Sequence, residues 1–109
     1  MLNLVALMGR CTVTPELKQA KDGISFSRFG IAVERNYKAD GKEKETDFLD
    51  IICWRHEADF AAKYFQKGQL IAVKGEIHTR TYEDTNGKKH KVVEISADEM
   101  YSAEHRRSD

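Results

Sequence analysis

The alternation of apolar and other side chains in residues 24–34 and 46–55 constrains the fold more than any other feature of the sequence. The alternating apolar residues are Phe29, Ile31 and Val33 in the first segment and Leu49, Ile51 and Cys53 in the second. A period of two is typical of a β-strand with one buried face, because successive side chains of a strand point to opposite sides. The sequence therefore predicts a protein built from half-buried strands.

Three further segments, residues 2–8, 69–82 and 91–100, also have the composition of strands. The turn sequences between strands are Lys21-Asp22-Gly23, Asp40-Gly41 and Asn86-Gly87. The Asn-Gly pair is the strongest hairpin signal among them. Five strands are therefore expected.

One helical pattern interrupts the strands at residues 56–67, with Phe60 and Tyr64 one turn apart and Gly68 as the expected C-terminal cap. Three strands, a helix and two strands predict an all-β fold, a five-stranded OB-fold barrel with one helix between strands 3 and 4. A chain of 109 residues suits one such domain. We expect this domain to span residues 1–102, with a short flexible extension at 103–109.

The composition is that of an ordinary folded protein. Charged residues make up 33% of the chain, and no apolar run approaches the roughly 18 residues that a membrane helix needs. The N-terminal sequence MLNLVALMGR lacks the basic start and cleavage site of a signal peptide, so a cytoplasmic protein is expected. Cys11 and Cys53 lie in no zinc-binding motif and are expected to be small core residues without a disulfide.

No motif points to catalysis, a metal or a cofactor. The sequence HEADF begins like the zinc-protease motif HExxH but has Phe60 in place of the second histidine. The glycines form neither a GxGxxG nor a Walker pattern. We therefore expect a binding protein rather than an enzyme, with no metal site and no cofactor.

The net charge is zero, which argues mildly against a simple polyanion binder. Basic residues nevertheless outnumber acidic ones in residues 1–38 and 74–91, and the reverse holds in 39–60 and 92–109. This distribution is compatible with a basic track facing an acidic edge, and equally with scattered surface charge.

Aromatic and basic side chains share predicted strand faces. Phe48 and Trp54 lie opposite the core face of their strand, and Tyr82 shares a face with His78 and Arg80. Rings beside cations favour stacking on unpaired bases, with the cations contacting phosphates. For any single ring, ordinary packing in the barrel or in an interface is the alternative.

Two further positions fit the same surface. Tyr37 lies beside Arg35 at the mouth of the second hairpin, and Gly30 and Ala32 leave room beside Arg28 for a flat ligand. Single strands suit such a surface better than duplexes, whose bases are already stacked.

Several stretches together resemble the bacterial and phage single-stranded DNA-binding protein family: LNLVALMGRCTVTPEL, SFSRFGIAVERNY, TDFLDIICWR, AAKYFQKGQLIAVKGEIHTRTYEDTNGK and VVEISAD. The resemblance covers about residues 1–100. It implies an OB-fold, usually a homotetramer, that binds and protects single-stranded DNA without sequence preference in replication, recombination and repair.

The resemblance also implies roles for individual residues. The stacking aromatics of the family correspond to Tyr37, Phe48, Trp54 and Tyr82. Its phosphate-contacting cations correspond to Arg10, Arg35, Arg55, Arg80, Lys88 and Lys89, and Arg28 joins them on its strand face. The dimer-forming edge of the family corresponds to the first strand, with Leu2, Asn3, Leu4, Val5, Ala6 and Met8.

The chain ends at AEHRRSD, where long family members continue into a linker and an acidic tip. The resemblance is to a form without this tail, either a piece of a longer chain or a naturally short relative, and recruitment of partners through a tail is not supported. Two alternatives remain: a dimeric primosome-type adaptor that acts mainly through protein contacts, and an OB-fold that binds RNA or an oligosaccharide.

Overall fold

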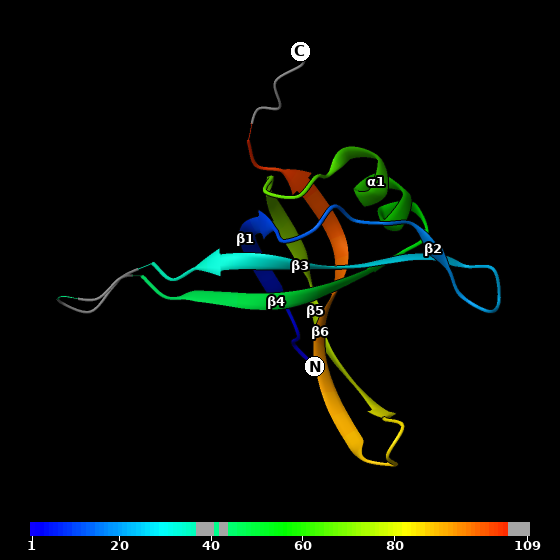
Figure 1. The fold of residues 1–109 in the computed structure, drawn as a ribbon. Helices are drawn as coiled ribbons and strands as arrows, with labels where there is room; N and C mark the ends of the chain where they lie inside the picture. Colours follow the sequence, from blue (N-terminus) through cyan, green and yellow to red (C-terminus); the bar gives the residue numbers. More distant parts are fainter. Residues whose placement is uncertain (37–40, 42–43, 105–109) are drawn as a thin grey trace.

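The computed structural model describes residues 1–36, 41 and 44–104, and the elements follow one another as Figure 1 shows. Their bounds are β1 (Val5–Cys11), β2 (Lys18–Gln19), β3 (Ser25–Glu34), β4 (Thr46–Trp54), α1 (His56–Tyr64), β5 (Leu70–Glu83) and β6 (Lys89–Ser102).

Five long strands close into a barrel. Their order is β1-β5-β6-β4-β3, and pairing of β1 with β3 closes the ring, while the two-residue β2 pairs only with β3. The β4–β6 contact is parallel and the other pairings are antiparallel. This ring, with α1 between the third and fourth long strands, confirms the predicted OB-fold.

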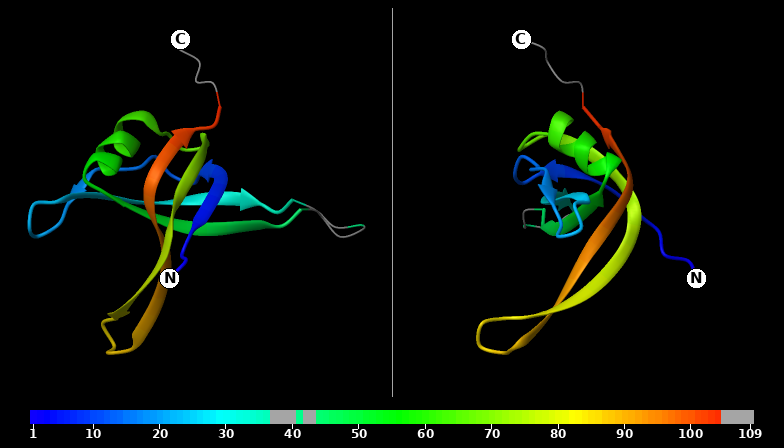
Figure 2. Two further views of the ribbon diagram at one scale, coloured as in Figure 1. Left: turned by 180° about the vertical axis from the view of Figure 1, so that it is seen from behind. Right: turned by 90° about the vertical axis from the view of Figure 1, so that its right-hand side faces the viewer.

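The helix lies at one end of the barrel, and the β5–β6 hairpin projects from the other end (Figures 1 and 2). A register shift between Lys74 and Gly75 lets Lys74 pair with Glu99 and Gly75 with Ala97, so that Asp98 is the extra residue of a bulge. Bulges bend a strand pair, and the β5–β6 hairpin is strongly curved along its length in the side view (Figure 2).

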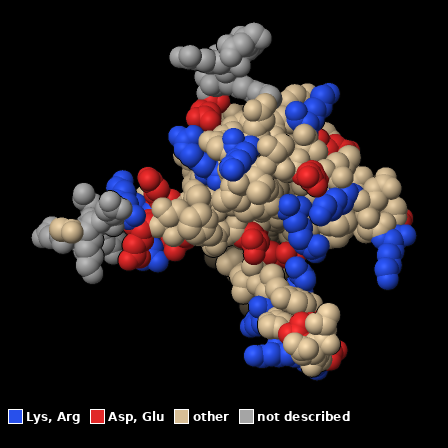
Figure 3. Space-filling view, in the orientation of Figure 1, with Lys and Arg blue, Asp and Glu red and all other residues tan. Residues whose placement is uncertain are grey.

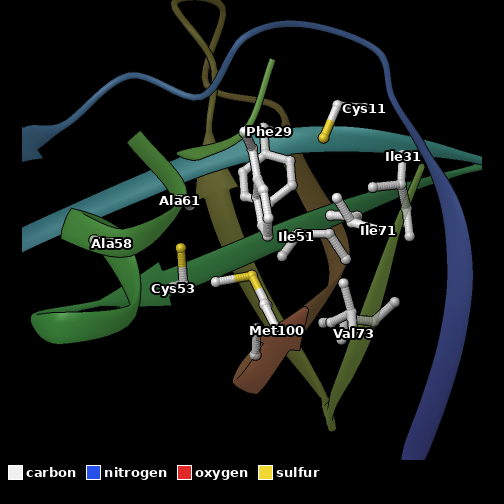
Figure 4. Close-up of a cluster of buried hydrophobic side chains, with 13 residues drawn as sticks. Cys11, Phe29, Ile31, Ile51, Cys53, Ala58, Ala61, Ile71, Val73 and Met100 are labelled. Atoms are coloured by element: carbon white, nitrogen blue, oxygen red, sulfur yellow. The ribbon is translucent and has the colours of Figure 1, made fainter. Parts of the chain in front are cut away.

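The core fills the barrel from the alternating strand positions and from α1 (Figure 4). Its buried members are Cys11, Phe29, Ile31, Ile51, Cys53, Ala58, Ala61, Phe65, Ile71, Val73, Ile95, Ala97 and Met100. Val33 and Leu49, also predicted for the core face, are partly buried and pack against it. The alternation therefore identified the buried face of β3 and β4 correctly.

Both cysteines are free and buried in this core, as expected. Burial raises the pKa of the Cys11 thiol to about 11 and that of the Cys53 thiol to about 12. Both groups are therefore neutral thiols near pH 7 and behave as small apolar side chains.

The first strand starts later than predicted, at Val5 instead of residue 2, and it runs on to Cys11. The physical reason lies in Asn3. Its side-chain amide donates to the Ile77 carbonyl and accepts from the Ile77 N–H, both at 2.9 Å. Because a side chain occupies both backbone groups of Ile77, the backbone ladder ends there.

The helix is shorter than predicted, and the assignment of Gly68 as its cap was wrong. The helix ends at Tyr64, and Phe65 takes an extended conformation as the C-terminal cap. Gly68 instead adopts a φ of 88° in the turn before β5, where its N–H donates to the Cys11 carbonyl at 2.8 Å. Burial of Phe65 in the core competes with continuation of the helix.

The expected extension at 103–109 lies mostly outside the described residues. Ala103 donates its N–H to the Leu70 carbonyl at 2.9 Å, and the Glu104 carboxylate accepts from the Leu70 N–H at 3.0 Å. In the described part of the chain, no helix has the length and apolar character needed to cross a membrane.

Candidate nucleic-acid interface

The outer face of β3 and β4 carries the predicted aromatic residues. Paired residues of neighbouring strands point to the same side, and β3 pairs with β4 at Phe26↔Trp54 and Ala32↔Phe48. Trp54 is 41% exposed and Phe48 is 74% exposed, whereas the intervening Ile51 is fully buried on the opposite face. Both aromatic side chains therefore lie outside the core, as predicted.

The same face continues onto β6 and β5. Ile52 on the outer face of β4 pairs with Ser96, so Ser96 lies on the outer face of β6. Glu94, two residues before Ser96, lies on the same face. The hairpin pairs Arg80↔Val92 and Tyr82↔His90 extend this side along β5 and β6. Residues from four strands thus form one continuous surface.

Seven residues on this surface form a series of contacts that we call the stacking row: Trp54, Phe26, Arg28, Glu94, Arg80, Tyr82 and His90. The rings of Trp54 and Phe26 are 5.4 Å apart between centroids, and the Arg28 guanidinium lies 5.3 Å from the Phe26 centroid. Rings and guanidiniums therefore lie in contact along the row.

Glu94 lies at the middle of the stacking row. Its Oε2 is 3.5 Å from Arg28 Nε and its Oε1 is 3.3 Å from Arg80 Nε. The Arg80 guanidinium in turn lies 5.9 Å from the centroid of Tyr82. The only buried carboxylate among the described residues is thus paired with two cations on a mostly exposed face.

The far end of the row lies near the tip of the hairpin. Tyr82 and His90 are stacked, with centroids 5.1 Å apart and ring planes at 20°. His90 Nε2 lies 2.7 Å from Asp84 Oδ2, and Asp84 Oδ1 accepts from the N–H groups of Asn86 and Lys88. These hydrogen bonds hold the pKa of the Asp84 carboxyl below its usual value, with His90 as the largest cause.

Phe48 lies apart from the row, toward the other end of β4. Tyr37, the remaining predicted stacking residue, lies outside the described residues.

Arg35 is already paired with acidic side chains. Its Nε and Nη2 each lie 3.1 Å from an Asp47 carboxylate oxygen, and its Nη1 lies 2.9 Å from Glu45. Hydrogen bonding to Arg35 lowers the pKa of Asp47, and the same bond raises the pKa of Arg35. Exposed pairs of this kind are weak, so a phosphate can compete for the guanidinium.

Arg10 also has partners within the protein. Its Nη1 donates to the Gly68 carbonyl at 3.0 Å and lies 3.3 Å from Glu104. The Arg10↔Ala32 pair places Arg10 level with Ala32, the register partner of Phe48.

The remaining predicted cations, Arg55, Lys88 and Lys89, are not members of the stacking row. Arg55 is exposed at the start of α1 with a φ of 56°, a rare value for a residue with a side chain. Lys88 is exposed in the hairpin turn. Lys89 pairs with Glu83 and therefore lies on the side of the hairpin opposite Tyr82.

The room expected beside Gly30 is partly occupied by Thr12. A Cβ atom placed on Gly30 would lie 2.6 Å from Thr12 Oγ1, and the Thr12 N–H donates to the Gly30 carbonyl. The absence of a side chain at Gly30 therefore allows the segment after β1 to cross β3. Gly30 also lines, together with Arg28, a hollow of about 270 Å³ on this face, so part of the expected room is present.

Three members of the row were missed from the sequence: Phe26, Glu94 and His90. Phe26 stands two residues before Arg28, so its outward position could have been read from the alternation. Glu94 was signalled only as one acid within the apolar run VVEISA. Nothing in the sequence distinguished His90 from other surface histidines.

Acidic and basic side chains are interspersed on the side of the molecule shown in Figure 3. The described residues contain no cluster of histidine, cysteine and acidic side chains that could hold a metal ion. On this surface the chemical groups available to a ligand are aromatic rings and guanidinium donors.

Comparison with known proteins identifies a matching family and related single-stranded DNA-binding proteins. The model of the single-strand binding protein family matches residues 2–103. The single-stranded DNA-binding protein of Caldanaerobacter subterraneus subsp. tengcongensis is 42% identical over 100 residues, which cover 92% of this chain and 67% of the relative.

Two further relatives agree. Single-stranded DNA-binding protein 1 of Lactococcus lactis subsp. lactis is 42% identical over 98 residues, 90% of this chain and 65% of the relative. The single-stranded DNA-binding protein of Halalkalibacterium halodurans is 38% identical over 108 residues, 99% of this chain and 64% of the relative. The chain spans about two thirds of the length of these relatives, and it belongs to the single-strand binding protein family.

Proposed function

We propose that the protein binds single-stranded DNA without sequence preference and protects it during replication, recombination and repair. It acts in the cytoplasm by binding alone, without catalysis, through residues 1–102. Bases stack on the exposed aromatic rings while arginine and lysine side chains neutralise phosphates. Family membership and the names of the relatives support this proposal.

The stacking row is the observation that carries the proposal. A strand of nucleic acid offers flat bases and charged phosphates, and the row offers aromatic rings at both ends with two guanidiniums between them on one face. Trp54 at one end and Tyr82 near the other are 41% and 45% exposed, so both rings are partly open to bases. A duplex offers no free base faces to these rings, which favours single strands.

The proposal predicts that a long oligo-dT quenches Trp54 fluorescence and that duplex DNA of the same length does so only weakly. Trp54 is the only tryptophan, so the signal reports one end of the row. Titrations over a range of salt concentrations should show log K falling against log[salt], with a slope of about −0.7 per phosphate contacted. Absence of quenching by either DNA would contradict the proposal and favour the protein-adaptor alternative.

We propose further that the chain associates with itself through residues 2–8, as a homotetramer or a dimer. Along β1, pairing with β3 involves only Arg10 and Cys11, so the earlier part of the strand has an open edge. Leu2, Leu4 and Met8 are exposed beside this edge. An open apolar edge favours pairing with another strand.

Light scattering on the purified protein tests this association. We expect a mass four times the chain mass of 12.5 kDa. A mass only twice that of one chain would favour the dimeric adaptor. Met8→Glu should lower the mass, because a charge would be buried in the proposed contact. Val13→Glu is the matched control, since Val13 is similarly exposed but lies outside β1. A monomeric wild-type protein would contradict the proposal.

A further inference from the structure

We infer that Glu94 is a positioning residue, whose buried carboxylate holds Arg28 and Arg80 together so that both guanidiniums contact one phosphate of single-stranded DNA. This inference rests on the proposed function and adds a phosphate subsite at the middle of the stacking row.

The two arginines come from strands that are not neighbours. The sheet order places β6 and β4 between β5, which carries Arg80, and β3, which carries Arg28. Glu94 on β6 reaches both, with one carboxylate oxygen for each guanidinium. Two guanidiniums that contact the same carboxylate repel each other. The shared anion, Glu94, therefore offsets this repulsion and holds them together.

The geometry leaves both guanidiniums able to bind a further anion. Glu94 contacts the Nε atom of each arginine at 3.3 Å and 3.5 Å, and the terminal nitrogens carry further N–H donors. The Arg28 and Arg80 side chains are 45% and 41% exposed, whereas the Glu94 side chain is only 9% exposed. The Glu94 carboxylate is therefore buried beneath the surface, while the guanidinium donors of Arg28 and Arg80 are exposed at the surface.

Aromatic contacts also restrain the same guanidiniums. Arg28 packs over Phe26 and Arg80 packs over Tyr82. The Arg28–Glu94 pair spans β4, which lies between β3 and β6. Ile52 of β4 is the register partner of Arg28 and is only 3% exposed, although it lies on the outer face. A base stacked on Tyr82 would thus place its phosphate near a cation whose orientation is already set.

A hollow of about 270 Å³ opens at this point of the surface. Arg28, Arg80 and Glu94 line it together with Asp50 and Val92. The hollow contains donors from both arginines, so a phosphate entering it can accept hydrogen bonds from two guanidiniums, a geometry that arginine favours.

Simple electrostatics makes the opposite prediction for Glu94. A negative charge on a surface that binds phosphates should weaken binding, and its removal should strengthen it. If Glu94 positions the arginines, its removal should weaken binding even though the surface becomes more positive. The sign of the effect therefore separates the two roles.

The test compares Glu94→Gln with Asp50→Asn, which removes one negative charge from the same hollow. Oligo-dT titrations at several salt concentrations should show about five-fold weaker binding for Glu94→Gln, with a salt slope smaller in magnitude by about 0.7, the loss of one phosphate contact. Asp50→Asn should bind more tightly than wild type, because it removes a negative charge from the hollow that is proposed to hold a phosphate. Thermal unfolding monitored by circular dichroism checks that both variants are folded.

Arg80→Lys provides a second test that does not alter the buried carboxylate. Lysine keeps the charge but lacks the planar fork that contacts Glu94 and phosphate together, so binding should again weaken about three-fold or more. Tighter or unchanged binding by Glu94→Gln would overturn the inference. If Glu94→Gln does not fold, an Arg80→Lys affinity equal to that of the wild-type protein would overturn it instead. Failure of the wild-type protein to bind oligo-dT would instead contradict the proposed function itself.

Discussion

Replacing Trp54 by alanine is expected to weaken oligo-dT binding by between about five- and 150-fold while the protein remains folded. Stacking of one base on an aromatic ring is worth about 1–3 kcal/mol, which corresponds to that range. Because the variant has no tryptophan, the measurement is the fluorescence anisotropy of a labelled oligo-dT. Loss of the contact with Phe26 should cost only about 1 kcal/mol of stability, since Trp54 is 41% exposed.

Tyr64→Ala is the matched control for this prediction. Tyr64 is 45% exposed, the same as Tyr82, but it lies on α1 rather than on the stacking row. Tyr82→Ala should weaken binding and Tyr64→Ala should leave it within about two-fold of wild type. Equal affinities for wild type and Trp54→Ala would show that the row is not where bases stack, and Phe48, which is 74% exposed and lies on the same strand as Trp54, would become the first residue to examine.

Gly75→Ala is expected to destabilise the protein by more than about 3 kcal/mol, a large part of the roughly 5–15 kcal/mol that stabilises a domain. Gly75 is buried at the bulge of the β5–β6 hairpin. A Cβ atom at this position would overlap the backbone carbonyl oxygen of Ser96, and it would lie 2.9 Å from the Ser96 carbonyl carbon. Backbone atoms of a paired strand cannot move aside as a flexible side chain can, and urea unfolding measures the cost.

Gly87→Ala separates this steric effect from the general cost of replacing glycine. Gly87 lies in the hairpin turn with a φ of 79°, and the nearest atom to an added Cβ is 3.6 Å away. Its replacement should cost only about 1–2 kcal/mol, the penalty for a left-handed backbone. If Gly75→Ala were no more destabilising than Gly87→Ala, the bulge would be able to relax around a methyl group.

The strands were predicted closely because their signals are local. Alternation placed β3 and β4 within one residue of their observed bounds and assigned Phe29, Ile51 and Cys53 to the core. Errors occurred where a tertiary contact overrides the local pattern. Pairing of Asn3 with Ile77 delays the start of β1, and burial of Phe65 ends α1 before the expected glycine.

The candidate site was only partly accessible from the sequence. The outward positions of Phe48 and Trp54 follow from the alternation of β4, because a strand has only two faces. The pairing of Arg35 with Asp47 could not be read in this way, because it depends on how the side chains of β3 and β4 meet across the hairpin. The position of Lys89 on the opposite side of the hairpin depends on the register that the turn sets.

By itself, the sequence determined the long strands to within a few residues, the buried faces of β3 and β4, the turns at residues 21–23 and 86–87, and the family, since these follow from residues close together in the chain. The predicted Asp40-Gly41 turn lies mostly outside the described residues. Only the tertiary structure decided that β4 runs parallel beside β6 and that Glu94 meets both Arg28 and Arg80. These contacts join segments far apart in sequence and exist only once the barrel has closed. The side-chain pattern of any one strand therefore carries no information about them.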